Sequence, residues 1–192
     1  MEITELGWML YFSREYERAI KQFQQVLELD PTFRSAHLGL GLAHVQKLMF
    51  KGAAGLQNVV SRSVLGMALA YVQKRIFREA IAEFQKAIAL SEHSALRITL
   101  KGMIHILSGE RVEAIKAIEE LRKLSEQGYV PPYYSVVLYL ALGEKDQALA
   151  WLEKAYDERS DFLVFLGQDP LFDNLRSDPR FADLARRVGL PP

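Results

Sequence analysis

The sequence predicts an all-α protein, a solenoid of helical hairpins closed by a C-terminal capping segment, and three observations lead to this fold class. First, an eight-residue phrase ending in Ala-Ile or Ala-Leu recurs, and Ala80, Ala114 and Ala148 within it lie 34 residues apart. Second, apolar residues on both sides of the phrase recur at steps of three and four, as on amphipathic helices. Third, Asp-Pro pairs, which favour helix starts, occur after the first hairpin, at Asp30, and twice in the C-terminal segment, at Asp169 and Asp178.

The first hairpin is predicted over residues 1–33. Its two helices carry small residues, Gly7 and Ala19, at positions that allow a close approach between them. Asp30 and Pro31 then end the second helix and start the next one. This segment therefore sets the pattern for the repeats that follow.

The second repeat, residues 34–60, is degenerate. Its first helix is clear, but only 27 residues separate Ala53 from Ala80, so the usual linker is missing. Two interpretations remain open for residues 48–63. One is a short, distorted helix with a tight turn near 61–63. The other is one long helix fused to the next repeat, which would favour exchange of helices between chains.

Three more repeats and a cap complete the predicted organisation. The repeats are expected over residues 61–94, 95–128 and 129–162, and the cap over 163–192. Within the cap, Asp169 and Asp178 each precede a proline, so we expect their carboxylates to cap two short helices. Phe172 and Phe181 follow at equal spacing and are expected to face inward and close the open end of the stack.

The order of residue types within the period resembles the tetratricopeptide repeat, which runs through an aromatic residue, Leu-Gly, Tyr, Ala, Phe and Pro. The fourth repeat departs from this pattern at Lys101, where Leu is usual. The resemblance implies a right-handed solenoid that binds proteins, with the first helix of each hairpin lining a concave groove. In residues 1–33 the matching positions are Ile3, Leu6, Gly7, Leu10, Ala19, Phe23 and Pro31.

The C-terminal segment, together with residues 143–148, is similar to the ends of tetratricopeptide segments in bacterial winged-helix regulators, protein kinases and cyclases. This resemblance implies an accessory sensing or docking module of a larger regulator. Because Met1 falls within the first predicted helix, we expect an excised or truncated chain.

Composition excludes several classes of function. The 192 residues include 24 basic and 24 acidic side chains, and this neutral balance argues against nucleic acid as the main partner. Without cysteine there is no disulfide, thiolate metal site or cysteine nucleophile. Outside the N-terminus, the most apolar stretch, residues 133–142, is about half the length of a membrane-spanning helix, and residues 1–12 lack the features of a signal peptide. We therefore expect a cytoplasmic protein without a membrane span.

No arrangement of residues in the sequence predicts catalysis. His37 and His44 lie seven residues apart on one helix, about 10 Å along its axis, which is too far to share one metal ion. The sequence contains no phosphate-binding glycine loop, no His-Glu-x-x-His pair and no Gly-x-Ser-x-Gly motif. We therefore expect a protein that is not an enzyme and has no catalytic, cofactor or metal site.

The positions that the resemblance assigns to the concave groove are mainly apolar. Groove sites for the acidic C-terminal peptides of chaperones need Lys, Arg and Asn, so we expect instead an apolar peptide or an amphipathic helix as the partner. A second interpretation remains open, in which the protein's own chain or a second copy fills the groove, the latter giving a homo-oligomer. The candidate partner-binding residues are Trp8, Tyr11, Phe12, Leu38, Leu42, Val45, Leu69, Val72, Met103, Ile106, Tyr133, Val137 and Leu140.

Overall fold

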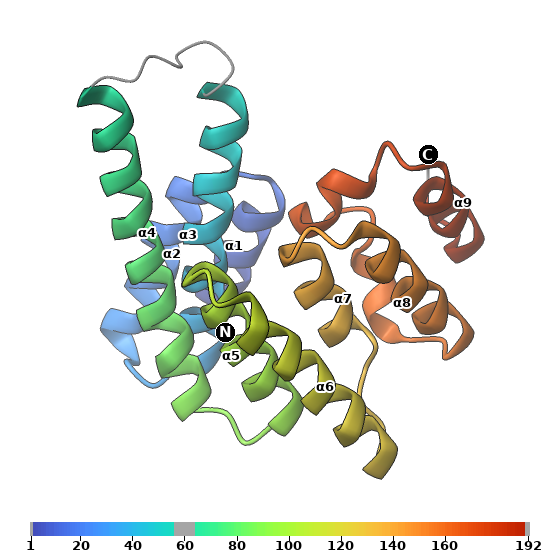
Figure 1. Cartoon of the computed structure of the whole chain (residues 1–192). Coiled ribbons are helices and arrows are strands. Elements are labelled where there is room, and N and C mark those ends of the chain that lie inside the picture. The colour runs from blue at the N-terminus through green and yellow to red at the C-terminus, as the bar shows by residue number, and fades with distance from the viewer. Residues whose placement is uncertain (1, 56–63, 191–192) are drawn as a thin grey trace. The chain divides into compact units, whose positions relative to one another are not determined.

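The structure is a computed structural model that describes the backbone of residues 2–55 and 64–190, and the side chains of residues 4–48 and 75–190. The described residues form helices and the turns between them, with no strand among them, which confirms the predicted all-α fold class (Figure 1). The chain divides into two compact units, Met1–Ser91 and Glu92–Pro192. Each unit is described by itself below.

The first unit begins with a short hairpin. Helix α1 covers Glu2–Phe12 and helix α2 covers Tyr16–Leu29. Between them, Arg14 adopts a left-handed conformation with φ 64°, and its guanidinium donates a 3.1 Å hydrogen bond to the Phe12 carbonyl oxygen. The side-chain bond helps to hold a backbone conformation that non-glycine residues rarely adopt.

The position of the Phe23 ring in α2 explains why two neighbouring positions, 7 and 39, are glycine. The ring is fully buried, and a Cβ atom built on Gly7 would lie only 2.6 Å from its Cε1 atom. A Cβ atom on Gly39, in the next helix, would also collide with this ring. Both glycines therefore allow neighbouring helices to close over one aromatic side chain, and the expected close contact at Gly7 is confirmed.

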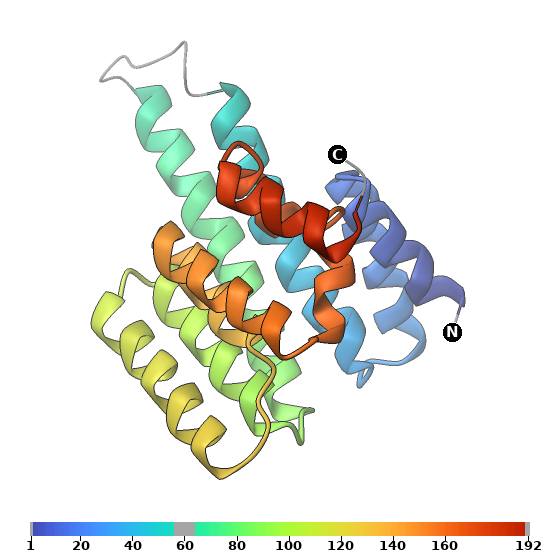
Figure 2. The same cartoon turned by 90° about the vertical axis from the view of Figure 1, so that its right-hand side faces the viewer.

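The remaining helices of the first unit are long. Helix α3 covers Arg34–Gly55 and helix α4 covers Val64–Ala89. Their outer ends project beyond α1 and α2 (Figures 1 and 2). The predicted turn near 61–63, and the alternative of a fused helix through 56–63, fall outside the described residues.

The expectation for the third repeat, residues 61–94, is corrected by the structure. Two helices with a turn before Ala80 were expected, but α4 runs through this point without a break. The other hairpins turn on a left-handed residue five positions before the repeated alanine, namely Arg14, Gly109 or Gly143. In α4 this position is Arg75, and no glycine lies beside it to favour a left-handed turn.

As a result, the first helix of the predicted second repeat pairs with the second helix of the predicted third repeat. A Cβ atom on Gly41 of α3 would lie 2.5 Å from Cε1 of Phe84 in α4. Next to this contact, Nδ1 of His37 lies 2.5 Å from Oε2 of Glu83. The two predicted repeats are therefore combined into one extended hairpin.

The second unit contains two regular hairpins, in the ranges expected for the fourth and fifth repeats. Gly109 and Gly143 form their turns with positive φ angles of 78° and 79°, a conformation that glycine adopts without strain. The helices are α5 (Ser94–Leu107), α6 (Arg111–Gln127), α7 (Tyr133–Ala141) and α8 (Lys145–Asp157).

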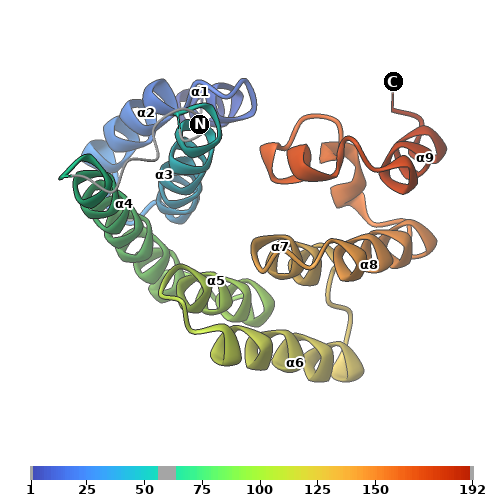
Figure 3. The same cartoon turned by 45° about the horizontal axis from the view of Figure 1, so that its top comes forward.

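The C-terminal segment packs along α7 and α8, as Figure 3 shows. It consists of the 3-10 helices η1 (Asp161–Phe165) and η2 (Pro170–Leu175) and of helix α9 (Pro179–Val188). The expected caps are confirmed, because the carboxylate of Asp169 accepts from the Leu171 backbone N–H and that of Asp178 accepts from the Arg180 backbone N–H. Buried cap side chains and α8 share one apolar cluster, including Leu149, Leu152, Phe172, Leu175, Phe181 and Leu184.

The cap of α9 predicts a pH dependence of stability. Hydrogen bonds from the Arg180 side chain and then its backbone N–H lower the pKa of Asp178 from 3.8 to about 2. Because the pKa is lower in the folded protein, the charged carboxylate stabilises the fold above pH 3.8, and this contribution is lost as the pH falls through about 2.

The Asp178→Asn variant isolates this effect, since the amide oxygen still caps the helix but cannot ionise. We expect wild type to have the higher thermal midpoint near pH 5 and the two midpoints to converge near pH 2. A difference that persists unchanged into strong acid would show that the carboxylate charge is not its cause.

Candidate functional site

Two pairs of apolar side chains on neighbouring helices form the candidate site. Trp8 and Phe12 lie one turn apart on α1, and Leu38 and Leu42 lie one turn apart on α3. All four are half-buried, so each presents part of its surface to solvent. Trp8, Phe12 and Leu42 also pack against the buried core of the first unit. We refer to these four residues as the α1/α3 face.

A hydrogen bond links the two halves of the α1/α3 face. The indole N–H of Trp8 donates to the Ser35 hydroxyl oxygen over 3.1 Å. Ser35 precedes Leu38 by three residues and Leu42 by seven, so the three lie on one stripe of α3. The bond therefore places the Trp8 ring beside this stripe. Sequence reasoning did not single out Ser35, although its helical spacing from the two leucines was a usable signal.

Aromatic contacts fix the orientation of Trp8. Its ring stacks on Phe12 at a centroid distance of 6.1 Å and meets the edges of Tyr11 at 5.7 Å and Phe23 at 5.4 Å. Such pairs each stabilise their geometry by about 0.5–1.5 kcal/mol beyond simple burial. Trp8 is thus an aromatic side chain that is held in place and still partly accessible.

Four of the candidate groove residues lie in the interior. Tyr11 is only 2% exposed, and Val45, Met103 and Val137 are also buried. These side chains support the packing of their helices and offer almost no contact surface. Two further candidates, Leu69 and Val72, belong to the part of α4 whose side chains lie outside the described residues.

Two of the α7 residues that were predicted to line the groove, Tyr133 and Leu140, contact the protein's own C-terminal segment. The Tyr133 ring stacks on Phe162 at 4.6 Å with an interplanar angle of 11°, and its hydroxyl donates a 3.0 Å hydrogen bond to Asp169 Oδ2. Leu140 packs against the buried cluster that includes Phe172. These contacts correspond to the second interpretation of the groove, in which the chain fills it.

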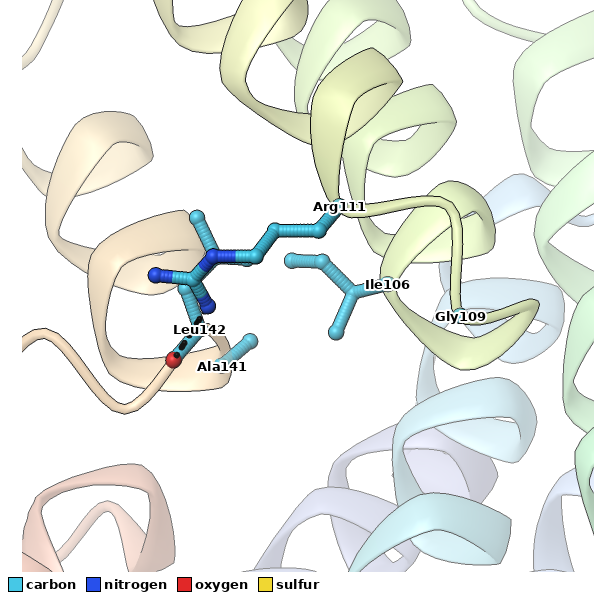
Figure 4. A pocket seen from close by; sticks show the side chains of 5 residues that line it. All are labelled: Ile106, Gly109, Arg111, Ala141 and Leu142. Atoms are coloured by element: carbon cyan, nitrogen blue, oxygen red, sulfur yellow. Dashed lines mark hydrogen bonds between the residues drawn. The ribbon is translucent and has the colours of Figure 1, made fainter.

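Ile106, the last of the candidates, lines a small open pocket of about 150 Å³ (Figure 4). The Arg111 side chain crosses toward the opposite wall, where its guanidinium donates to the Leu142 carbonyl oxygen over 3.3 Å and pairs with Glu144. Arg111 therefore ties one hairpin turn to the next. Because its own side chain engages both partners, the pocket offers little free hydrogen-bonding capacity to a ligand.

The histidines of α3 are occupied by packing partners. The two ring nitrogens of His37 lie 2.5 Å from Glu83 Oε2 and 2.8 Å from the Pro31 carbonyl oxygen. Burial lowers the pKa of His44, and the nearby carboxylate of Glu79 partly offsets this effect. Within the described residues, no group of three His, Cys, Asp or Glu side chains is arranged to hold a metal ion. No described helix is long and apolar enough to cross a membrane.

Comparison with protein families gives two matches, one in each unit. A model described as "TPR repeat" matches residues 9–47, and a model described as "Tetratricopeptide repeat" matches residues 136–162. The first match spans most of the α1/α3 face, and the second spans most of the α7–α8 hairpin. Comparison with curated proteins finds no significant match.

Proposed function

The chain is a tetratricopeptide repeat protein, and because such repeats generally mediate protein–protein interactions, we propose that it binds an amphipathic helix or apolar peptide on its α1/α3 face. The single observation that carries this proposal is the state of Trp8, which is half-buried and fixed by its bond to Ser35. Partly exposed, rigid aromatic side chains are typical anchors of protein interfaces, because little conformational entropy is lost when they are buried.

The spacing within the face fits a helical partner. Trp8 and Phe12 are separated by one helical turn, as are Leu38 and Leu42, so the face offers two parallel apolar ridges. An amphipathic helix carries its own apolar residues at steps of three and four, which match ridges of this kind. No charged side chain belongs to the four, so the face selects for apolarity rather than for the sign of a charge.

The second unit has a different role in this proposal. Tyr133 and Leu140 are engaged by the C-terminal segment, so an external helix would have to displace buried contacts to reach them. We therefore assign partner binding to the first unit. Self-filling, the alternative kept open for the groove, applies to α7 in the second unit.

The test uses Trp8 as its own reporter. In a Trp151→Phe background Trp8 is the only tryptophan. Peptides of 15–20 residues selected from a display library against the immobilised wild-type protein are then titrated into this variant. We expect apolar, helix-forming peptides to be selected and to shift the Trp8 emission, because binding removes the indole ring from water.

The Leu42→Asp variant is expected to lose peptide binding, because it places a negative charge on the apolar α1/α3 face. We expect this variant to bind the selected peptides with at least tenfold lower affinity and to keep an unchanged circular dichroism spectrum. Ile115→Asp, an exposed apolar position on α6, is the control and should leave binding intact. Equal loss in both variants, or dimerisation through the face in sedimentation experiments, would contradict binding of an external helix there.

A further inference from the structure

A histidine and a glutamate are buried together between α3 and α4, and peptide binding on the α1/α3 face uses neither of them. His37 of α3 is 3% exposed, and only 13% of the Glu83 side chain in α4 is accessible to solvent. Titratable side chains are rarely buried unless their charges and hydrogen bonds are satisfied. The partners of this pair therefore indicate which protons it carries.

Both ring nitrogens of His37 lie next to oxygen atoms. Nε2 lies 2.8 Å from the carbonyl oxygen of Pro31, in the loop before α3, and Nδ1 lies 2.5 Å from Oε2 of Glu83. A carbonyl and an ionised carboxylate only accept hydrogen bonds, and a neutral imidazole has a single N–H to donate. A neutral ring beside an ionised carboxylate would therefore leave one of these contacts without a hydrogen. The folded pair must hold one additional proton.

Lys86 determines where this proton lies. Its ammonium group donates a 2.9 Å hydrogen bond to Oε1, the other carboxylate oxygen of Glu83. A cation at this distance favours the ionised carboxylate, so the additional proton lies on His37 and makes its ring an imidazolium. Both N–H groups of His37 then have an acceptor, and both oxygens of Glu83 have a donor. A buried ion pair is stabilising only when its hydrogen bonds are satisfied in this way.

Neighbouring titratable groups along α3 and α4 have partners of their own. Lys47 of α3 pairs with Glu17 of α2 at 3.5 Å, and Glu79 of α4 pairs with Arg75 at 3.0 Å. His44 lies 3.6 Å from the same Glu79 carboxylate, but burial lowers its pKa below the ordinary value of 6.5. His44 is therefore neutral at pH 7 and above. The charged residues nearest in sequence to Pro31 and His37 are Asp30, which accepts from Thr32, and Arg34.

We propose that His37 and Glu83 form a pH-sensitive switch that stabilises the pairing of α3 with α4. With the additional proton bound, the imidazolium ring connects α3, the loop before it and α4. Without this proton, the lone pair of Nδ1 faces the carboxylate across the same short distance, and the buried contact becomes repulsive. The first unit therefore loses stability as the pH rises above neutral. The switch is independent of peptide binding on the α1/α3 face.

The test is the pH dependence of unfolding of the first unit. A free histidine titrates near about pH 6.5, so above about pH 7 the unfolded chain lacks the proton that the folded pair holds. The unfolding equilibrium constant should therefore increase with pH, by up to about tenfold per pH unit for one proton. Urea denaturation between about pH 7 and 8.5, followed by Trp8 fluorescence in the Trp151→Phe background, measures this slope.

The Glu83→Gln variant removes the need for the additional proton. Its side-chain amide donates to Nδ1 of a neutral His37, while the Nε2–H group still donates to the Pro31 carbonyl oxygen. We expect this variant to fold and to lose most of the pH slope. His44→Gln is the matched control on the same helix, because His44 is already neutral in this pH range. Its slope should equal that of wild type.

Nitrogen-15 NMR of the imidazole rings gives a readout that a merely structural contact would not change. In the folded wild type at about pH 7.5 we expect both ring nitrogens of His37 to be protonated, whereas Glu83→Gln should have only one protonated nitrogen. A neutral His37 ring in the folded wild type would overturn the proposal. So would an equal pH slope in wild type and Glu83→Gln, or a slope that disappears in His44→Gln.

Discussion

Replacing Phe84 by Ala should lower the free energy of unfolding of the first unit by about 3–5 kcal/mol, the range for removing a fully buried aromatic ring. Phe84 is fully buried, and its ring lies against Gly41. Urea denaturation followed by Trp8 fluorescence in the Trp151→Phe background measures this unit selectively. A loss of this size tests whether Phe84 is part of the core of this unit.

A double-mutant cycle makes this test specific. Gly41→Ala alone should be destabilising, because the new Cβ atom would lie 2.5 Å from the Phe84 ring. In the Phe84→Ala background the same change should cost much less, with a coupling of about 0.5–3 kcal/mol. Gly128→Ala is the control, since its φ is 176° and no atom lies within 4 Å of the new Cβ. Additive effects at Gly41 and Phe84 would rule out their contact.

The second large effect is expected at Phe172. Its ring is fully buried in the cluster that joins the cap to α8, where it packs against Phe181 at 5.9 Å and Tyr133 at 6.4 Å. Phe172→Ala should therefore destabilise the second unit by about 3–5 kcal/mol. Trp151 packs against the same cluster, so its fluorescence in a Trp8→Phe background reports the unfolding of this unit.

Phe165→Ala is the matched control for the cap. It removes the same ring from the same C-terminal segment, but Phe165 is 38% exposed, so we expect a smaller loss than at Phe172. If the two variants lose equal stability, or if Phe172→Ala leaves the urea midpoint unchanged, the C-terminal segment is not part of the core of the second unit.

Local patterns predicted the local structure. The Asp-Pro pairs at Asp169 and Asp178 predicted helix starts because capping depends on neighbours only two residues away. Gly7 predicted a close helix contact because the period placed it opposite the second helix of its own hairpin. The prediction of a hairpin for the third repeat was wrong, because the period does not show whether a turn can form. The turn of this repeat needed a left-handed residue at Arg75, and the period alone did not reveal that the helix would continue.

In the candidate site, too, the sequence predicted some features and missed others. The repeat pattern predicted a set of groove positions, of which Trp8, Phe12, Leu38 and Leu42 are half-buried on neighbouring helices. It did not distinguish them from the positions that lie in the interior, such as Tyr11. Nor did it show that Phe162, far along the chain, would cover Tyr133. Burial depends on residues that are distant in sequence, and a periodic pattern carries no information about them.

The sequence by itself therefore determined the all-α class, the 34-residue period and the capped C-terminal segment, because each depends on composition or short-range spacing. Only the tertiary structure decided which helices pair, as in the contact of Gly41 with Phe84. It also decided that Tyr133 and Leu140 of α7 pack against the cap, while the residues of the α1/α3 face are only half-buried. The physical reason is that packing selects among partners that the local pattern makes equally suitable.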